Sequence, residues 1–195
     1  MSDQIPFILG VLALLATPGP TNTLMAAAGA QRGLTRSLPL LAGEVLGYFI
    51  AITAWTELVG AATATLPWVP VAAKLVAAAF LLWSAWKLWR SAGRTDFARR
   101  GIGLSQAFVT TLINPKALVF AFAIFPPVDF MARQPYLAIF AGLVVITAVG
   151  WITLGMMAAR RSAGLLTSSR IERITAVALA IFATLLVVST IEPLL

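Results

Sequence analysis

The sequence predicts an all-α membrane protein with six transmembrane helices, on the evidence of its composition and its long apolar runs. Of the 195 residues, 60% are hydrophobic and 11% are charged, and the mean hydropathy is +0.94. A soluble domain has about 45–50% apolar and about 25% charged residues. Its apolar stretches are hydrophobic on every side and lack a long alternation, which favours helices over barrel strands.

Six apolar runs are each close to the roughly 20 residues that a helix needs to cross a bilayer. We expect them to form a single transmembrane domain over residues 1–195, embedded in lipid. The predicted spans are 5–29, 38–60, 68–90, 104–126, 135–158 and 172–191.

The basic residues predict how these spans are oriented. Eleven of the 14 lie in the three odd-numbered loops: Arg32, Arg36, Lys87, Arg90, Arg94, Arg99, Arg100, Arg160, Arg161, Arg170 and Arg173. The positive-inside rule places those loops in the cytoplasm and therefore both termini outside. Since the basic residues are distributed as topology signals, we expect no binding to nucleic acid.

The chain contains no cysteine and no histidine. Thiolate nucleophiles, imidazole bases and the usual zinc ligands are therefore missing. We expect no cofactor, no bound metal and no enzymatic activity, because a catalytic cluster is hard to assemble without these groups. Export of soft metals is disfavoured for the same reason.

Prolines interrupt the first and the fourth span at matching depth. In the first span the polar and helix-breaking residues are Thr17, Pro18, Gly19, Pro20, Thr21, Asn22 and Thr23, and in the fourth they are Asn114, Pro115 and Lys116. Each proline removes a backbone donor, so the carbonyls of Leu14, Ala16 and Thr111 lose their usual helical partner. We expect a polar, hydrated site near the bilayer centre, because unpaired carbonyls are costly in hydrocarbon.

A proline kink that only shapes packing is the alternative interpretation of each break. Two breaks at matched depth favour an internal repeat instead, with copies at about 1–95 and 100–195. Each copy has three spans, so the second is inverted, as in many secondary transporters.

Two charges lie within the spans near these breaks. Lys116 is the deepest, and Glu44 lies about 9 Å from the predicted cytoplasmic edge of the second span. Both helices enter from the cytoplasm, so a direct or water-bridged pair between them is expected. The alternatives are a structural tether of Lys116 to freed carbonyls and an interfacial position for Glu44. Gly43 and Gly47 flank Glu44 and predict close helix packing or, second, dimerisation.

These motifs resemble the LysE/RhtB family of amino-acid exporters. That family carries Pro-Gly-Pro in the first span and Asn-Pro-Lys in the fourth, which here are Pro18-Gly19-Pro20 and Asn114-Pro115-Lys116. Its train of glycines is matched by Gly33, Gly43 and Gly47. Two positions depart from the family: Ser37 replaces a glycine, and Tyr48 stands where many members have an acid. Glu44, one turn earlier, is the candidate to replace that acid.

The resemblance implies a secondary transporter of the bacterial cytoplasmic (inner) membrane that exports a small amino acid or derivative by proton antiport. The expected partners are that solute, protons and the lipid bilayer, and a homo-oligomer is left open. The expected solute and ion pathway comprises Thr17, Pro18, Gly19, Pro20, Asn22, Glu44, Asn114, Pro115 and Lys116. A channel and a structural membrane protein without transport activity are the alternatives.

Overall fold

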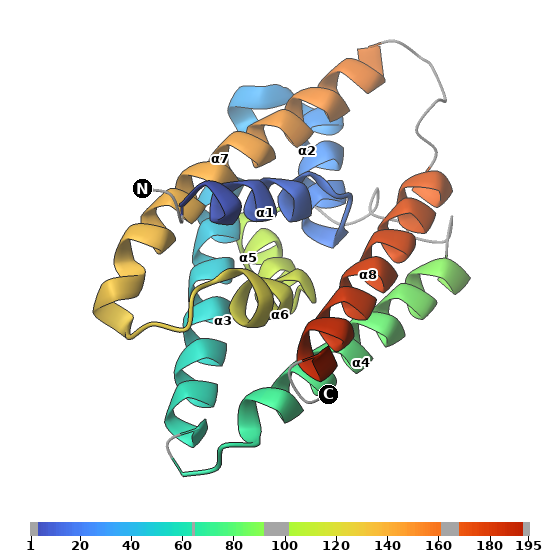
Figure 1. The fold of residues 1–195 in the computed structure, drawn as a ribbon. Helices are drawn as coiled ribbons and strands as arrows, with labels where there is room; N and C mark the ends of the chain where they lie inside the picture. The colour runs from blue at the N-terminus through green and yellow to red at the C-terminus, as the bar shows by residue number, and fades with distance from the viewer. Residues whose placement is uncertain (1–3, 64, 92–101, 161–167, 193–195) are drawn as a thin grey trace.

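The computed structural model describes residues 4–63, 65–91, 102–160 and 168–192, and nearly all of them are helical (Figure 1). This confirms the predicted all-α class. Several sequence predictions lie outside the described residues, namely the boundary between the repeats near 95–100 and the basic residues Arg94, Arg99, Arg100 and Arg161.

The first predicted span is two helices, α1 (Gln4–Ala16) and α2 (Pro20–Ser37), which meet at an angle of 61°. The break comprises residues 17–19, as predicted from its prolines. Helix α2 runs past the predicted end at residue 29, and within it Gly33 adopts φ 76°. Residues with a side chain rarely adopt that conformation, so glycine permits a kink there.

The fourth predicted span is likewise interrupted. Helix α5 (Leu104–Leu112) is followed by the short helix α6 (Lys116–Val119) and a π-helical turn, η2 (Phe120–Ile124). The segment after the break is bent by 53° from α5. Interrupted first and fourth helices are thus confirmed.

The other spans are continuous helices, α3 (Leu40–Thr63), α4 (Val69–Ser91), α7 (Phe130–Arg160) and α8 (Ser168–Ile191). Helices α3, α4 and α7 are each long and apolar enough to cross a membrane, and each bent pair adds one candidate span. In α8 the apolar part is the shorter segment Ala176–Ile191. The chain is therefore a multi-pass membrane protein.

Helix α7 begins five residues before the predicted start of its span at Pro135. Asp129 Oδ1 accepts the backbone N–H of Ala132 at 2.9 Å, which caps the helix and lets it start at Phe130. Pro135 then lies inside α7, where its missing N–H leaves the carbonyl of Met131 without its usual helical donor. In this early segment, Arg133 is buried and pairs with Glu57 at the end of α3, with 2.5 Å between nitrogen and oxygen.

Glycines bring the helices around the centre into backbone contact. A Cβ on Gly29 of α2 would lie 2.0 Å from the carbonyl oxygen of Ile152, and one on Gly155 of α7 would lie 1.9 Å from that of Ala26. Gly43 and Gly47 of α3 face α5 in the same way. The GxxxG pair therefore serves packing within the bundle, the first of its two predicted uses.

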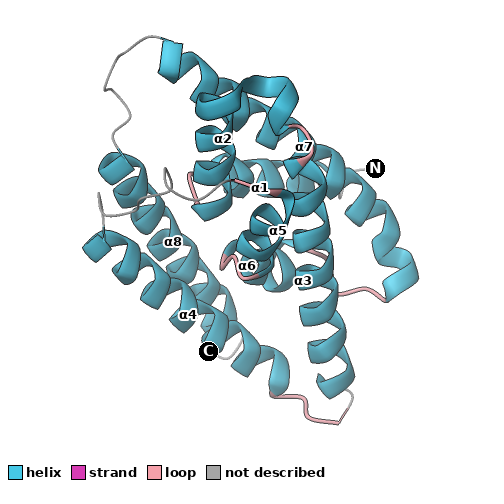
Figure 2. Cartoon of the chain, turned by 180° about the vertical axis from the view of Figure 1, so that it is seen from behind, coloured by secondary structure: helices cyan, strands magenta, loops and turns pink. Residues whose placement is uncertain are grey.

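These contacts place α5 and α6 in the middle of the molecule. Helix α3 packs along α5, α2 packs along α7, and α4 and α8 form a pair at one side. Figures 1 and 2 show this arrangement from opposite directions, with the α4–α8 pair apart from the other helices. The two breaks therefore face the interior.

Candidate functional site

The breaks in the first and fourth spans meet at one buried polar cluster. Thr21, at the start of α2, places its hydroxyl oxygen 3.2 Å from that of Thr111 in α5. The amide Nδ2 of Asn114 donates to Thr21 Oγ1 at 3.0 Å. All three side chains are at least 97% buried. Segments some 90 residues apart in the chain thus share their polar groups.

The hydrogen bonds in this cluster have a single consistent direction. Thr111 donates its hydroxyl to the carbonyl of Ala107 at 2.8 Å, so it accepts from Thr21. Thr21 in turn accepts from Asn114, which also donates to Tyr48 Oη at 3.4 Å. Asn114 Oδ1 accepts the backbone N–H of Lys116 at 3.0 Å. The amide of Asn114 therefore links α2, α3 and the start of α6.

Lys116 crosses from α6 to the end of α1. Its ammonium donates to the carbonyl oxygen of Leu14 at 2.9 Å and also to that of Thr17. The side chain is 1% exposed. Leu14 is one of the carbonyls that the prolines were predicted to free, and the positive charge lies at the negative end of the α1 dipole. An ammonium has three donors, and two of them have acceptors among the described residues.

Asn22 satisfies the neighbouring carbonyls of the same helix end. Its Nδ2 donates to Leu15 O at 2.7 Å and to Thr17 O at 2.8 Å. The carbonyl of Thr111 has no helical donor at Pro115, as predicted, but it is not left unpaired. The backbone N–H of Asn114 reaches it at 3.0 Å through a tight turn that the unwound chain before Pro115 permits.

The residues of the Pro-Gly-Pro segment leave room for the lysine. A Cβ on Gly19 would lie 3.0 Å from Lys116 Cε and 3.1 Å from Nζ. Pro20 occupies the first position of α2, where its missing N–H is not needed. Pro18 and Pro115 lie at the two breaks and separate the helical segments.

Glu44 is buried beside this cluster without joining it. Its side chain is 1% exposed, and Oε2 has no hydrogen-bond partner in the part of the chain that the structure describes. The direct form of the expected pair with Lys116 is not made: both residues are described, and the ammonium lies on the α1 carbonyls, which is the contact that the tether alternative predicts. Among the described residues, no group of three or more acidic side chains is placed to hold a metal ion.

Tyr48 is the site residue that the sequence did not assign. From the sequence it was noted only because many family members have an acid at this position. In the structure its ring is buried against Phe120 and Phe140, and its hydroxyl accepts a hydrogen bond from Asn114. Its position one turn after Glu44 places it on the same face of α3 as that buried carboxyl, which is the signal that could have found it. Thr21 and Thr111 also belong to the cluster.

Two interrupted helices whose breaks share a buried polar cluster define a class, that of helical membrane proteins with discontinuous spans. The sequence comparison names the family within that class. The model of the LysE type translocator family matches residues 12–190, so the chain belongs to this family. It is a family of translocators.

Curated relatives give the comparison more detail. A cysteine/O-acetylserine efflux protein of Salmonella choleraesuis is 29% identical over 53% of this chain and 54% of its own length. A homoserine/homoserine lactone efflux protein of Salmonella typhi is 38% identical over 39% of each chain. The chain thus spans about half the length, or less, of these relatives. No solved structure matches it.

Proposed function

We propose that this protein exports a small amino acid or amino-acid derivative from the bacterial cytoplasm across the inner membrane. The observation that carries the proposal is the ammonium of Lys116, buried at the junction of two interrupted spans and bound to backbone carbonyls. Membership of the translocator family and relatives named for cysteine, O-acetylserine and homoserine efflux support it.

The cluster has a group for each end of a zwitterionic solute. Lys116 has a third N–H donor, which suits the carboxylate of the solute. The amino group of the solute has the same chemistry as the lysine ammonium, so it can take over the carbonyls of Leu14 and Thr17. In this mechanism Lys116 holds the empty site closed and swings to the carboxylate when the solute enters.

Glu44 is the proposed proton carrier. Its buried Oε2 has no hydrogen-bond partner among the described residues, and Glu44 lies one helical turn from Tyr48, which contacts Asn114. Protonation and release would alternate as the site opens to the two sides of the membrane. One charge moved across 100 mV supplies about 2.3 kcal/mol, enough to concentrate a solute several tens-fold.

The test is solute flux in proteoliposomes that contain the purified protein. Labelled O-acetylserine, cysteine and homoserine are loaded inside or outside, with and without a pH gradient. We expect flux of at least one solute, accelerated by the gradient. Ion conductance without coupled solute exchange would instead identify a channel, and no flux in any arm would contradict the proposal for these solutes.

Two substitutions assign the roles within this assay. Lys116→Met is expected to reduce flux at least about tenfold, because about 1.4 kcal/mol of binding is lost with the charge. Lys74→Met removes a lysine of α4 that lies outside the cluster, and serves as the matched control with unchanged flux. Glu44→Gln should retain solute exchange and lose its response to the pH gradient. Full coupling in Glu44→Gln would remove the proposed role of that carboxylate.

A further inference from the structure

Helices α4 and α8 form a pair whose outer faces are not covered by the other residues that the structure describes. Each packs mainly against the other, with smaller contacts to α3 and α6 (Figures 1 and 2). Large apolar side chains on both remain about half exposed, for example Trp89 at 52% and Ile181 at 55%.

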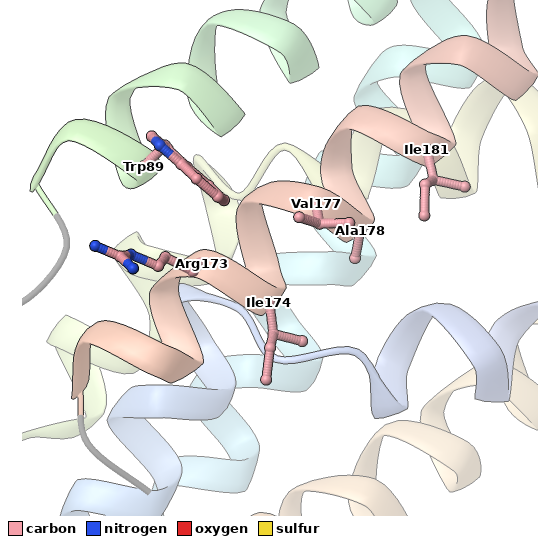
Figure 3. Close-up of a pocket in the computed structure, with 6 residues that line it drawn as sticks. All are labelled: Trp89, Arg173, Ile174, Val177, Ala178 and Ile181. Atoms are coloured by element: carbon pink, nitrogen blue, oxygen red, sulfur yellow. The ribbon is translucent and has the colours of Figure 1, made fainter.

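One groove on this pair is lined by a continuous stripe of apolar side chains. It has a volume of about 440 Å³ and is lined by Trp89, Arg173, Ile174, Val177, Ala178 and Ile181 (Figure 3). The α8 residues recur every three or four positions and therefore lie on one face of the helix. From Ile174 to Ile181 the stripe is about 10 Å long, which fits within the roughly 15 Å of one leaflet.

Cations gather at the end of the α4–α8 pair where Trp89 and Arg173 lie, and of these Arg173 lines the groove. The guanidinium of Arg173 lies 5.6 Å from the ring centre of Trp89, that of Arg90 lies 4.9 Å from Trp86, and the ammonium of Lys87 lies 5.1 Å from Trp83. Cation–π contacts hold these charges at the level of the aromatic rings, which is the headgroup level of a bilayer. The positive-inside rule assigns this end to the cytoplasmic leaflet, where anionic lipids are enriched.

We propose that the groove binds one anionic phospholipid. Its acyl chain lies along the stripe of Ile174, Val177 and Ile181, and its phosphate meets the guanidinium of Arg173, a planar donor suited to phosphate oxygens. A second copy of the chain fits less well. A two-fold axis along the membrane normal would bring the same cations of both copies together at one end.

The inference is tested on the detergent-solubilised protein and needs no transport activity. Native mass spectrometry counts bound lipid during titration with phosphatidylglycerol or with phosphatidylcholine of the same acyl chains. We expect one tightly bound molecule of phosphatidylglycerol and weaker binding of phosphatidylcholine. Arg173→Gln should lower the affinity for phosphatidylglycerol about fivefold, which corresponds to about 1 kcal/mol per basic residue.

Matched variants separate the groove from general surface charge. Arg36→Gln removes an exposed cation of α2 that does not line the groove and should leave binding unchanged. Ala178→Phe fills the groove and should abolish the bound lipid, whereas Leu185→Phe, on an exposed part of α8 beyond it, should not. Equal binding of both lipids, equal effects of the two arginine variants, or a dimer that excludes lipid from the groove would overturn the proposal.

Discussion

Lys116 and the carbonyls at the end of α1 stabilise each other, because each is costly to bury without the other. A lysine at the centre of a bilayer costs at least about 2.5–3.5 kcal/mol, and a carbonyl without a donor costs several kcal/mol in hydrocarbon. The prolines free the carbonyl of Leu14, and the ammonium bonds to it at 2.9 Å. The buried charge and the broken helix are therefore stable together, and a change in either exposes the other.

Gly19→Ala tests this dependence at a single residue. The added methyl group would lie 3.0 Å from Lys116 Cε, so the flexible lysine must move away from the carbonyls. We expect solute flux in proteoliposomes to fall about fivefold, for a loss of about 1 kcal/mol in hydrogen bonding. The melting temperature should change little. Gly142→Ala in α7, where a Cβ would have no described atom within 4 Å, is the control. Equal flux in both variants would contradict the contact.

Local backbone chemistry explains which parts of the site were predictable. The missing N–H of Pro18 is enough to identify Leu14 as a freed carbonyl, because the two residues lie four apart in the sequence. The partner of Lys116 is a different kind of question, because Glu44 and the α1 carbonyls both suit an ammonium. The choice depends on how α1 crosses α6, and that crossing is a property of the packed molecule. The position of Tyr48 in the cluster likewise depends on how the helices pack, so local backbone chemistry does not predict it.

At the scale of helices, backbone contacts through glycine hold α2 against α7 and α3 against α5. Gly155→Ala would place a methyl group 1.9 Å from the carbonyl oxygen of Ala26, so α2 and α7 would have to separate. Overpacking of this kind costs about 1–3 kcal/mol. We expect a clearly lower midpoint of thermal unfolding in detergent.

Gly150→Ala, on the same helix with no described atom within 4 Å of its added Cβ, provides the comparison. Alanine favours a helix over glycine by about 0.5–1 kcal/mol, so this variant should be as stable as the parent chain or slightly more stable. If both variants unfold at the same temperature, the close approach of α2 and α7 is wrong.

Hydrophobic length was enough to locate the helices, whereas their ends and angles depend on finer chemistry. Helix α3 covers Leu40–Thr63, where the apolar run predicted 38–60. Helix α7 starts earlier than its apolar run because Asp129 caps it, and apolar length carries no information about a cap. The bends of 61° and 53° follow from tertiary packing, since a proline predicts a break without fixing its angle.

At the scale of the whole molecule, the distribution of basic residues makes a prediction about orientation. The chain has no native cysteine, so single cysteines report accessibility without background. Thr65→Cys, between α3 and α4, should react with a membrane-impermeant maleimide in intact bacterial spheroplasts. Thr35→Cys, near the end of α2, should react only after the membrane is opened. The reverse pattern would place both termini in the cytoplasm.

The central claim is that the breaks of the two interrupted spans meet at one site and that transport passes through it. The most direct measurement is flux in proteoliposomes of a Thr21→Cys, Thr111→Cys double variant, because the native hydroxyl oxygens are 3.2 Å apart. Oxidation is expected to form an internal disulfide, detectable by mass spectrometry, and to stop flux, with recovery after reduction and no effect on either single variant. Failure of the cysteines to cross-link, or full flux in the cross-linked protein, would contradict the account.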